Sequence, residues 1–175
     1  MEFEIDRTVY LIKEIKSKTI KDFVNSVEVM REVSCSSSRP INIIINCEGG
    51  QVDEAFFLYD YLKSLNHSNI RTVVTGKCWS AANLVFCGGN ERYCYKHSCF
   101  MLHNITLTLE PARPAALKAL SNYVEDQQLE FLKIVAQHTS VRTFHDNLMH
   151  RIQEDEQYFF DGDFAYKLGY AKLLA

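Results

Sequence analysis

The sequence lacks an excess of basic residues, an apolar run of membrane length and any Cys-x-x-Cys pair. Its 19 Lys and Arg residues are outnumbered by 22 Asp and Glu residues, which gives a net charge of −3. That balance leaves no basic footprint for a nucleic acid and no polybasic patch for a lipid surface. No apolar run approaches the ~20 residues that span a bilayer, and the acidic, patterned N-terminus is not typical of a signal peptide. We therefore expect no nucleic-acid partner and no membrane association.

Six cysteines are present, most of them inside apolar runs, where a free thiol behaves as a small hydrophobic side chain. This usage is typical of a reducing compartment, so we expect a cytoplasmic protein. Cys94, His97, Cys99 and His103 lie close together in the sequence. Their spacing is not that of a zinc knuckle or ribbon, so we expect neither a metal nor another cofactor.

The 175 residues are enough for one domain with a substantial core, and no repeat or linker divides them. Strand-like runs lie at 7–12, 41–46, 70–75, 91–95, 99–103 and 157–160. Helical spacing of apolar residues marks 17–34, 52–65, 80–88, 112–137, a segment through about 152, and 162–168. The alternation predicts an α/β fold with a mainly parallel sheet. Ligands of such sheets lie beyond the carboxyl ends of the strands, here the loops after 46, 75 and 102.

These three loops hold the residues that could carry chemistry. Gly49 and Gly50 lie between a buried strand and a helix, where backbone N–H groups favour negative charge, although a tight turn alone would also explain them. Taken singly, Ser80 is typical of a helix N-cap and His103 of a core histidine. Together, a serine, an imidazole and backbone donors on one rim of the sheet are the set that acyl transfer requires.

Three segments, Asn46 to Val52, Gly76 to Ala81 and Met101 to His103, resemble motifs of the proteolytic subunit of the Clp protease, ClpP. The resemblance runs from about residue 7 to 174 and looks closest to divergent, phage-type members of the family. It implies a ClpP/crotonase-like α/β fold in a single peptidase domain, 1–175. The head would comprise about 1–104 and 154–175, and a handle with a protruding long helix about 105–153.

The same resemblance implies roles for individual residues. Ser80 matches the nucleophile, His103 matches the general base, and the backbone N–H groups of Gly50 and Ala81 match the oxyanion hole. The family's third catalytic position, usually an aspartate, falls on Gln157 by register. A shift of the register would bring Glu156 or Asp155 there instead.

The implied function is a serine endopeptidase that hydrolyses peptides or unfolded proteins inside a ring, a heptamer or tetradecamer in the family. The location would be the cytoplasm, that of a host if the protein is phage-encoded. Partnership with an AAA+ unfoldase or a host ClpP subunit stays open, because the segment before the first strand is short and the handle lacks the family's glycines. Two alternatives remain: a catalytically weak or inactive structural homologue that associates with another peptidase ring, and a crotonase-like acyl-CoA enzyme.

Overall fold

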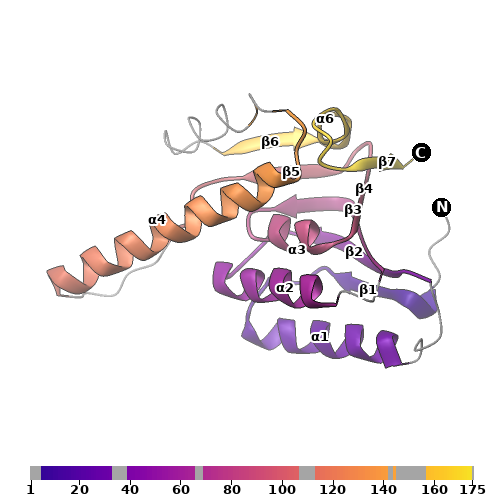
Figure 1. Ribbon diagram of the computed structural model, residues 1–175, viewed down its shortest axis with the longest axis horizontal. Coiled ribbons are helices and arrows are strands. Elements are labelled where there is room, and N and C mark those ends of the chain that lie inside the picture. Colours follow the sequence, from indigo (N-terminus) through magenta and orange to yellow (C-terminus); the bar gives the residue numbers. More distant parts are fainter. Residues whose placement is uncertain are drawn as a thin grey trace.

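The computed structural model describes residues 5–32, 39–65, 69–106, 113–141, 144 and 157–174. Within them, a short 3-10 helix (Ile5–Arg7) leads into a seven-stranded sheet (Figure 1). Five strands are adjacent and parallel, in the order β1 (Thr8–Leu11), β2 (Ile41–Cys47), β3 (Ile70–Trp79), β4 (Glu91–Tyr95) and β7 (Lys172–Leu174). Strand β5 (Cys99–Leu102) runs parallel to the end of β3 and antiparallel to β6 (Tyr158–Asp161). The predicted α/β fold with a mainly parallel sheet is confirmed.

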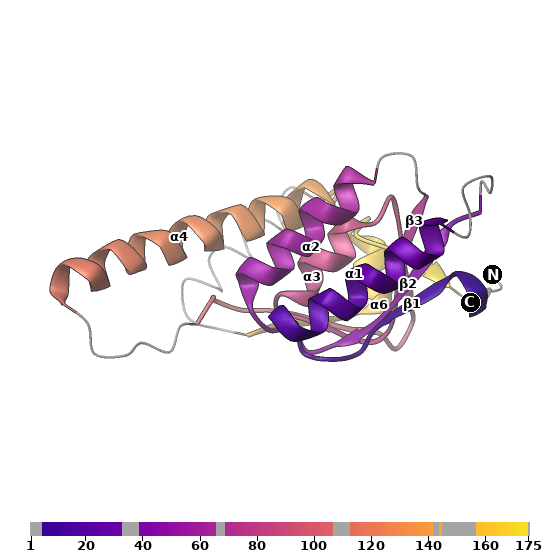
Figure 2. The ribbon, with the colours of Figure 1, turned by 90° about the horizontal axis from the view of Figure 1, so that it is seen from below.

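Three helices, α1 (Ser17–Glu32), α2 (Val52–Ser64) and α3 (Ala82–Gly88), cover the same face of this sheet (Figure 2). Strand β2 presents Ile41, Ile43 and Ile45 to them, all with at most 1% of their surface exposed. Every residue of α3 is buried. Burial of this β-branched and aliphatic surface is the main stabilising contribution to the fold. It also fixes the start of α3 against the ends of β2 and β3.

Helix α4 (Pro114–Gln137) projects beyond the edge of the sheet, as the long helix was predicted to do (Figure 1). A proline occupies its first turn, where the missing N–H costs no hydrogen bond. Only its C-terminal turns are buried, through Phe131, Leu132, Ile134 and Val135. Most of the predicted helix through residue 152 lies outside the described residues, and the division into head and handle stays a prediction. In the described part of the chain, no helix combines the length and apolarity needed to cross a membrane.

The predicted end of the third strand, at residue 75, is wrong. Strand β3 continues through Gly76 to Trp79, because Lys77–Trp79 pair with Cys99–Met101 of β5. The helix predicted from Ser80 begins instead at Ala82, with Ala81 at its N-cap. Ser80 therefore lies between β3 and α3 and belongs to neither, which bears on whether its hydroxyl caps the helix.

The C-terminal segment returns to the sheet beside β5 and β4. The helix predicted over 162–168 is α6 (Gly162–Lys167), and Asp161 caps it by accepting a hydrogen bond of 2.8 Å from the N–H of Phe164. The chain then turns into β7, which pairs with β4 and which the sequence did not predict. Its three residues are too short for a periodic signal, and their pairing with β4 defines the strand.

Candidate active site

Ser80 has an unusual backbone conformation for a residue with a side chain. Its φ is 51°, in the left-handed region that L-residues avoid. Its N–H donates to the carbonyl oxygen of Met101 at 2.7 Å, which fixes it against β5. The helix N-cap is Ala81 and makes no side-chain capping bond, so the capping interpretation of Ser80 is wrong. The hydroxyl instead contacts the imidazole of His103.

His103 lies next to that hydroxyl. Its Nε2 is 2.8 Å from Oγ of Ser80, within hydrogen-bonding distance. The pairing of β3 with β5 explains the approach, because Trp79 lies opposite Met101, β3 ends at that pair and β5 ends one residue after it. The structure thus brings together the serine and the imidazole that the sequence placed on one rim.

The third element of the site is the turn at Gly49 and Gly50, which have φ values of 100° and 145°. Gly49 lies directly behind the serine, since a Cβ at this position would be 3.0 Å from Cβ of Ser80. Residues 13–16, which we call the strap, hold the turn from the other side. The N–H of Ile15 donates to the carbonyl of Gly49, and the N–H of Gln51 donates to the carbonyl of Ile15, both at 2.8 Å.

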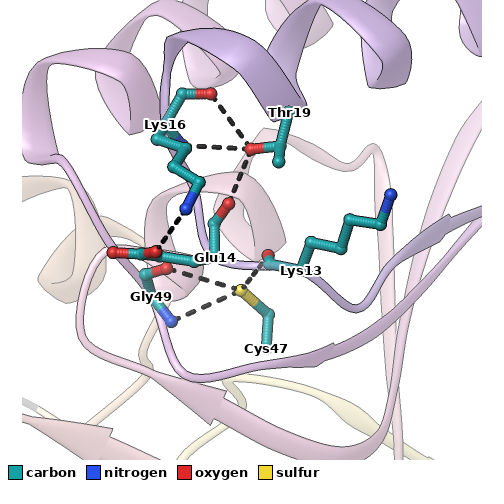
Figure 3. A network of polar contacts seen from close by, with 6 residues as sticks. All are labelled: Lys13, Glu14, Lys16, Thr19, Cys47 and Gly49. Carbon is teal, nitrogen blue, oxygen red and sulfur yellow. Dashed lines mark hydrogen bonds and ion pairs between the residues drawn. The ribbon is translucent and has the colours of Figure 1, made fainter.

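Cys47 joins the strap to the turn (Figure 3). Its thiol donates to the carbonyl of Lys13 at 3.2 Å, and its sulfur accepts from the N–H of Gly49 at 3.3 Å. Burial raises the pKa of the Cys47 thiol, so it remains a neutral donor at physiological pH. The thiol therefore orients the peptide unit that joins Glu48 to Gly49, directly before the turn.

Two backbone N–H groups remain available at the serine. Among the described residues, neither the N–H of Gly50 nor that of Ala81 donates a hydrogen bond. Both residues line the cleft of about 790 Å³ that also contains Ser80 and His103. Backbone donors beside a nucleophile can stabilise the negative charge that develops on a carbonyl oxygen under attack.

The remaining wall of this cleft is part apolar and part acidic. Val52, Ala81, Ile105 and Phe131 supply the apolar part, whereas Glu14, Glu48, Asp53 and Glu54 supply carboxylates. Several of these carboxylates have partners. Glu48 pairs with Lys77 at 2.6 Å, and the hydroxyl of Tyr123 on α4 donates to Asp53. Such a cleft offers an extended peptide both hydrophobic contact and polar edges.

The third catalytic position, which would orient His103, was predicted at residues 155–157. Gln157 is exposed and directly precedes β6. Because Leu102 pairs with Tyr158 in the antiparallel ladder, continuation of that register would bring Gln157 opposite His103. No hydrogen bond between these two side chains is present. Glu156 and Asp155, the alternatives, lie outside the described residues.

Sequence reasoning missed two residues behind the serine, Asn83 and Tyr170, both with no exposed surface. The side chain of Asn83 contacts the peptide units around Ser80, and Tyr170 contacts Asn83. The available signal was an asparagine inside the apolar run of α3, where an unpaired amide would be costly. Across the described residues, no group of three or more His, Cys, Asp or Glu side chains is arranged to hold a metal ion.

Comparisons with known proteins define the class. A family model described as Clp protease matches residues 2–171. The "ATP-dependent Clp protease proteolytic subunit 1" of Protochlamydia amoebophila is 28% identical over 137 residues, which cover 73% of this chain and 63% of the relative. The protein of the same name from Chlamydia pneumoniae is 29% identical over 99 residues, covering 55% of this chain and 50% of the relative. A ClpP1 mutant from Listeria monocytogenes has a similar structure, with a TM-score of 0.79, 18% identity and coverage of 97% and 91% of the two chains.

The chain belongs to the Clp protease family, as its motifs predicted. The structural likeness, at 18% identity, supports the ClpP fold. The chain spans less than two thirds of the length of the curated relatives named above. These relatives are bacterial subunits and do not support the phage-type placement, which stays a prediction. None of them is an acyl-CoA enzyme, so that alternative gains no support.

Proposed function

We propose that the chain is a serine-type endopeptidase subunit that hydrolyses peptide bonds through an acyl-enzyme. The observation that carries this proposal is the 2.8 Å approach of Ser80 Oγ to His103 Nε2 beside the N–H groups of Gly50 and Ala81. Membership of the Clp protease family agrees with it. Peptides or unfolded proteins are the proposed substrates.

The geometry suggests a sequence of proton transfers. With its proton on Nδ1, His103 accepts the Ser80 proton at Nε2 as Oγ attacks the peptide carbonyl carbon. The N–H groups of Gly50 and Ala81 donate to the oxyanion, and loss of one such donor costs about 3 kcal/mol of barrier. His103 then protonates the leaving amine. A water molecule, deprotonated in turn by His103, hydrolyses the ester on Ser80.

The third catalytic member is proposed to come from residues 155–157, with Gln157 favoured by the β5–β6 register. A glutamine amide can orient the imidazole through a hydrogen bond. It carries no charge to stabilise the imidazolium that forms during attack. We therefore expect slow turnover if Gln157 is the third catalytic residue, and faster turnover if Glu156 or Asp155 is.

Assembly into a ring, heptameric or tetradecameric, is part of the proposal. Exposed apolar side chains on the projecting helix α4 support it: Leu117, Tyr123 and Leu129 have 36%, 44% and 45% of their surface exposed. Association with an AAA+ unfoldase or with another ClpP subunit is left to experiment. A cytoplasmic location is proposed on the buried, unpaired thiols of Cys47, Cys78, Cys87 and Cys94.

The test is covalent labelling with a fluorophosphonate or a β-lactone, combined with cleavage of short fluorogenic peptides. We expect one label per chain on the wild-type protein, and none on Ser80→Ala or on protein blocked beforehand. The oligomeric state of both proteins is measured by native mass spectrometry. A folded wild-type oligomer that neither labels nor cleaves would overturn the proposal.

A second candidate is a catalytically weak or inactive subunit that joins another peptidase ring and alters its activity. The uncharged Gln157 opposite the histidine position favours it. Mixing the purified chain with an active ring-forming subunit distinguishes the two. A change in the partner's peptidase activity that persists with Ser80→Ala supports the second candidate, and no change on mixing argues against it.

A further inference from the structure

A buried asparagine lies directly behind the proposed nucleophile. Asn83, in the first turn of α3, has no exposed surface. Its Nδ2 lies 3.0 Å from each of three backbone carbonyl oxygens, those of Cys78, Ser80 and Met101. An amide nitrogen has two hydrogens, so at least one of them is shared between two acceptors. The three carbonyls come from the end of β3, from Ser80 itself and from β5.

The other end of the Asn83 amide is also held. The hydroxyl of Tyr170 donates to its Oδ1 at 3.2 Å, and Sγ of Cys87 lies 3.3 Å from the same hydroxyl. Since the one hydroxyl hydrogen goes to Asn83, the thiol of Cys87 is the donor to Tyr170. Burial raises the pKa of both Tyr170 and Cys87, so both stay neutral. This chain of bonds fixes which way the amide faces.

These hydrogen bonds connect the backbone of Ser80 to the strand that leads to His103. Ser80 has a φ of 51°, which needs support from its surroundings to persist in a residue with a Cβ. The carbonyl of Met101 accepts from both the Ser80 N–H and the Asn83 amide, and His103 follows two residues later. Asn83 thus joins the peptide unit of the serine to the strand that carries the imidazole.

An apolar side chain at position 83 could not donate a hydrogen bond to any of these three carbonyl oxygens. The neighbours of Asn83 on α3, Ala82, Leu84, Val85 and Phe86, are all fully buried and apolar. A polar side chain in such surroundings is tolerated only when its hydrogen bonds are made, and each is then specific in direction. The buried amide of Asn83 is therefore tolerated because it makes hydrogen bonds to the backbone around Ser80.

We propose that Asn83 is a positioning residue of the hydrolytic site, which sets the Ser80–His103 distance through the main chain and is itself oriented by Tyr170 and Cys87. This inference rests on the proposed peptidase function. Asn83 does not touch the substrate or the reacting atoms. Its contribution should therefore appear in the rate of the chemical step and leave substrate binding nearly unchanged.

The experiment compares Asn83→Ala and Tyr170→Phe with the wild type and with a control, Thr72→Val. Thr72 is also fully buried and donates to the carbonyl of Phe86 at 2.8 Å, on α3 but away from Ser80. For each protein, kcat and KM with a fluorogenic peptide and the rate of fluorophosphonate labelling are measured well below its Tm. Loss of the Thr72 bond should lower the Tm and leave kcat and labelling unchanged.

For Asn83→Ala we expect kcat and the labelling rate to fall ~10- to 100-fold with KM changed less than ~3-fold, as for a displaced catalytic group. Tyr170→Phe, which removes one hydroxyl and keeps the ring, should lose ~2- to 10-fold in kcat. It carries the test if Asn83→Ala does not fold. Wild-type kcat in the folded variants, or an effect confined to KM, would overturn the inference.

Crystal structures separate this inference from the proposed function. A wild-type protein that never labels refutes the peptidase proposal, but the positioning claim can still be decided. In Asn83→Ala, Oγ of Ser80 should move beyond hydrogen-bonding distance of Nε2 of His103, and the φ of Ser80 should leave the left-handed region. An unchanged 2.8 Å contact in that variant would refute the positioning role.

Discussion

Replacing Gly49 by alanine tests whether the glycine turn and the serine form one closely fitted unit. A Cβ at Gly49 would lie 2.8 Å from the carbonyl oxygen of Trp79, 3.0 Å from Cβ of Ser80 and 3.1 Å from the nitrogen of Ala81. These distances are 0.3–0.6 Å below the 3.4 Å at which ordinary van der Waals contact begins. Two of the three atoms belong to the backbone, so no flexible side chain can move aside.

The magnitude follows from these contacts and from the φ of 100° at Gly49. Alanine in such a conformation costs about 1–3 kcal/mol of stability. The added methyl group must also push Ser80 or Ala81 by a fraction of an ångström. A misplacement near 1 Å costs ~100-fold in rate, so we expect labelling of Ser80 to slow ~10- to 100-fold. That corresponds to about 1.4–2.8 kcal/mol of barrier.

The assay is the second-order rate constant for fluorophosphonate labelling, followed by intact-protein mass spectrometry at a temperature where the variant is fully folded. Gly88→Ala serves as the matched control. Its Cβ would lie 2.9 Å from Cδ1 and 3.1 Å from Cβ of the buried Leu62, at the end of α3 away from Ser80, so this variant should lose stability without displacing the nucleophile. A folded Gly49→Ala protein that labels within ~2-fold of the wild type would refute the close fit, because steric displacement at the nucleophile would then have no cost.

Three further predictions concern the surroundings of the site. Cys47→Ser keeps a donor and an acceptor for the glycine turn and should label within ~3-fold of the wild type, whereas Cys47→Val should be clearly slower; equal rates would argue against the thiol's role. Burial and two nearby cations lower the pKa of His138 from 6.5 to about 4. Between pH 6.5 and 4 the unfolded chain therefore binds a proton at His138 that the folded chain does not bind. The Tm should fall as the pH drops through this range. His138→Gln should flatten this loss, and an unchanged pH dependence would count against it. Asp161→Ala removes the cap on the Phe164 N–H and should lower the urea-unfolding free energy by about 1 kcal/mol, which an unchanged midpoint would contradict.

The sequence was most informative where chemistry and periodicity agreed. Ser80 and His103 were identifiable because each follows a buried strand, and the carboxyl ends of parallel strands meet at one rim. The Gly49–Gly50 turn was identifiable because no other residue type tolerates such backbone angles. The continuation of β3 past Gly76 was not predictable, since it depends on pairing with β5, which is distant in the sequence.

Other features depend on contacts that a linear pattern does not contain. Asn83 looked like an ordinary interruption of an apolar helix, and Tyr170 an ordinary aromatic near a glycine. Their relation to Ser80 appears only when α3, β5 and the C-terminal segment lie side by side. The third catalytic position is a matter of register, and a slip of one residue exchanges Gln157 for a carboxylate.

The central claim is that one carbonyl carbon can lie within reach of Ser80, His103 and the two backbone donors at once. A crystal structure of the chain after reaction with a peptidyl fluorophosphonate tests it most directly. We expect phosphorus bonded to Ser80 Oγ and its oxygen within hydrogen-bonding distance of the nitrogens of Gly50 and Ala81. An adduct on any other residue, or a phosphoryl oxygen directed away from both nitrogens, would contradict the account.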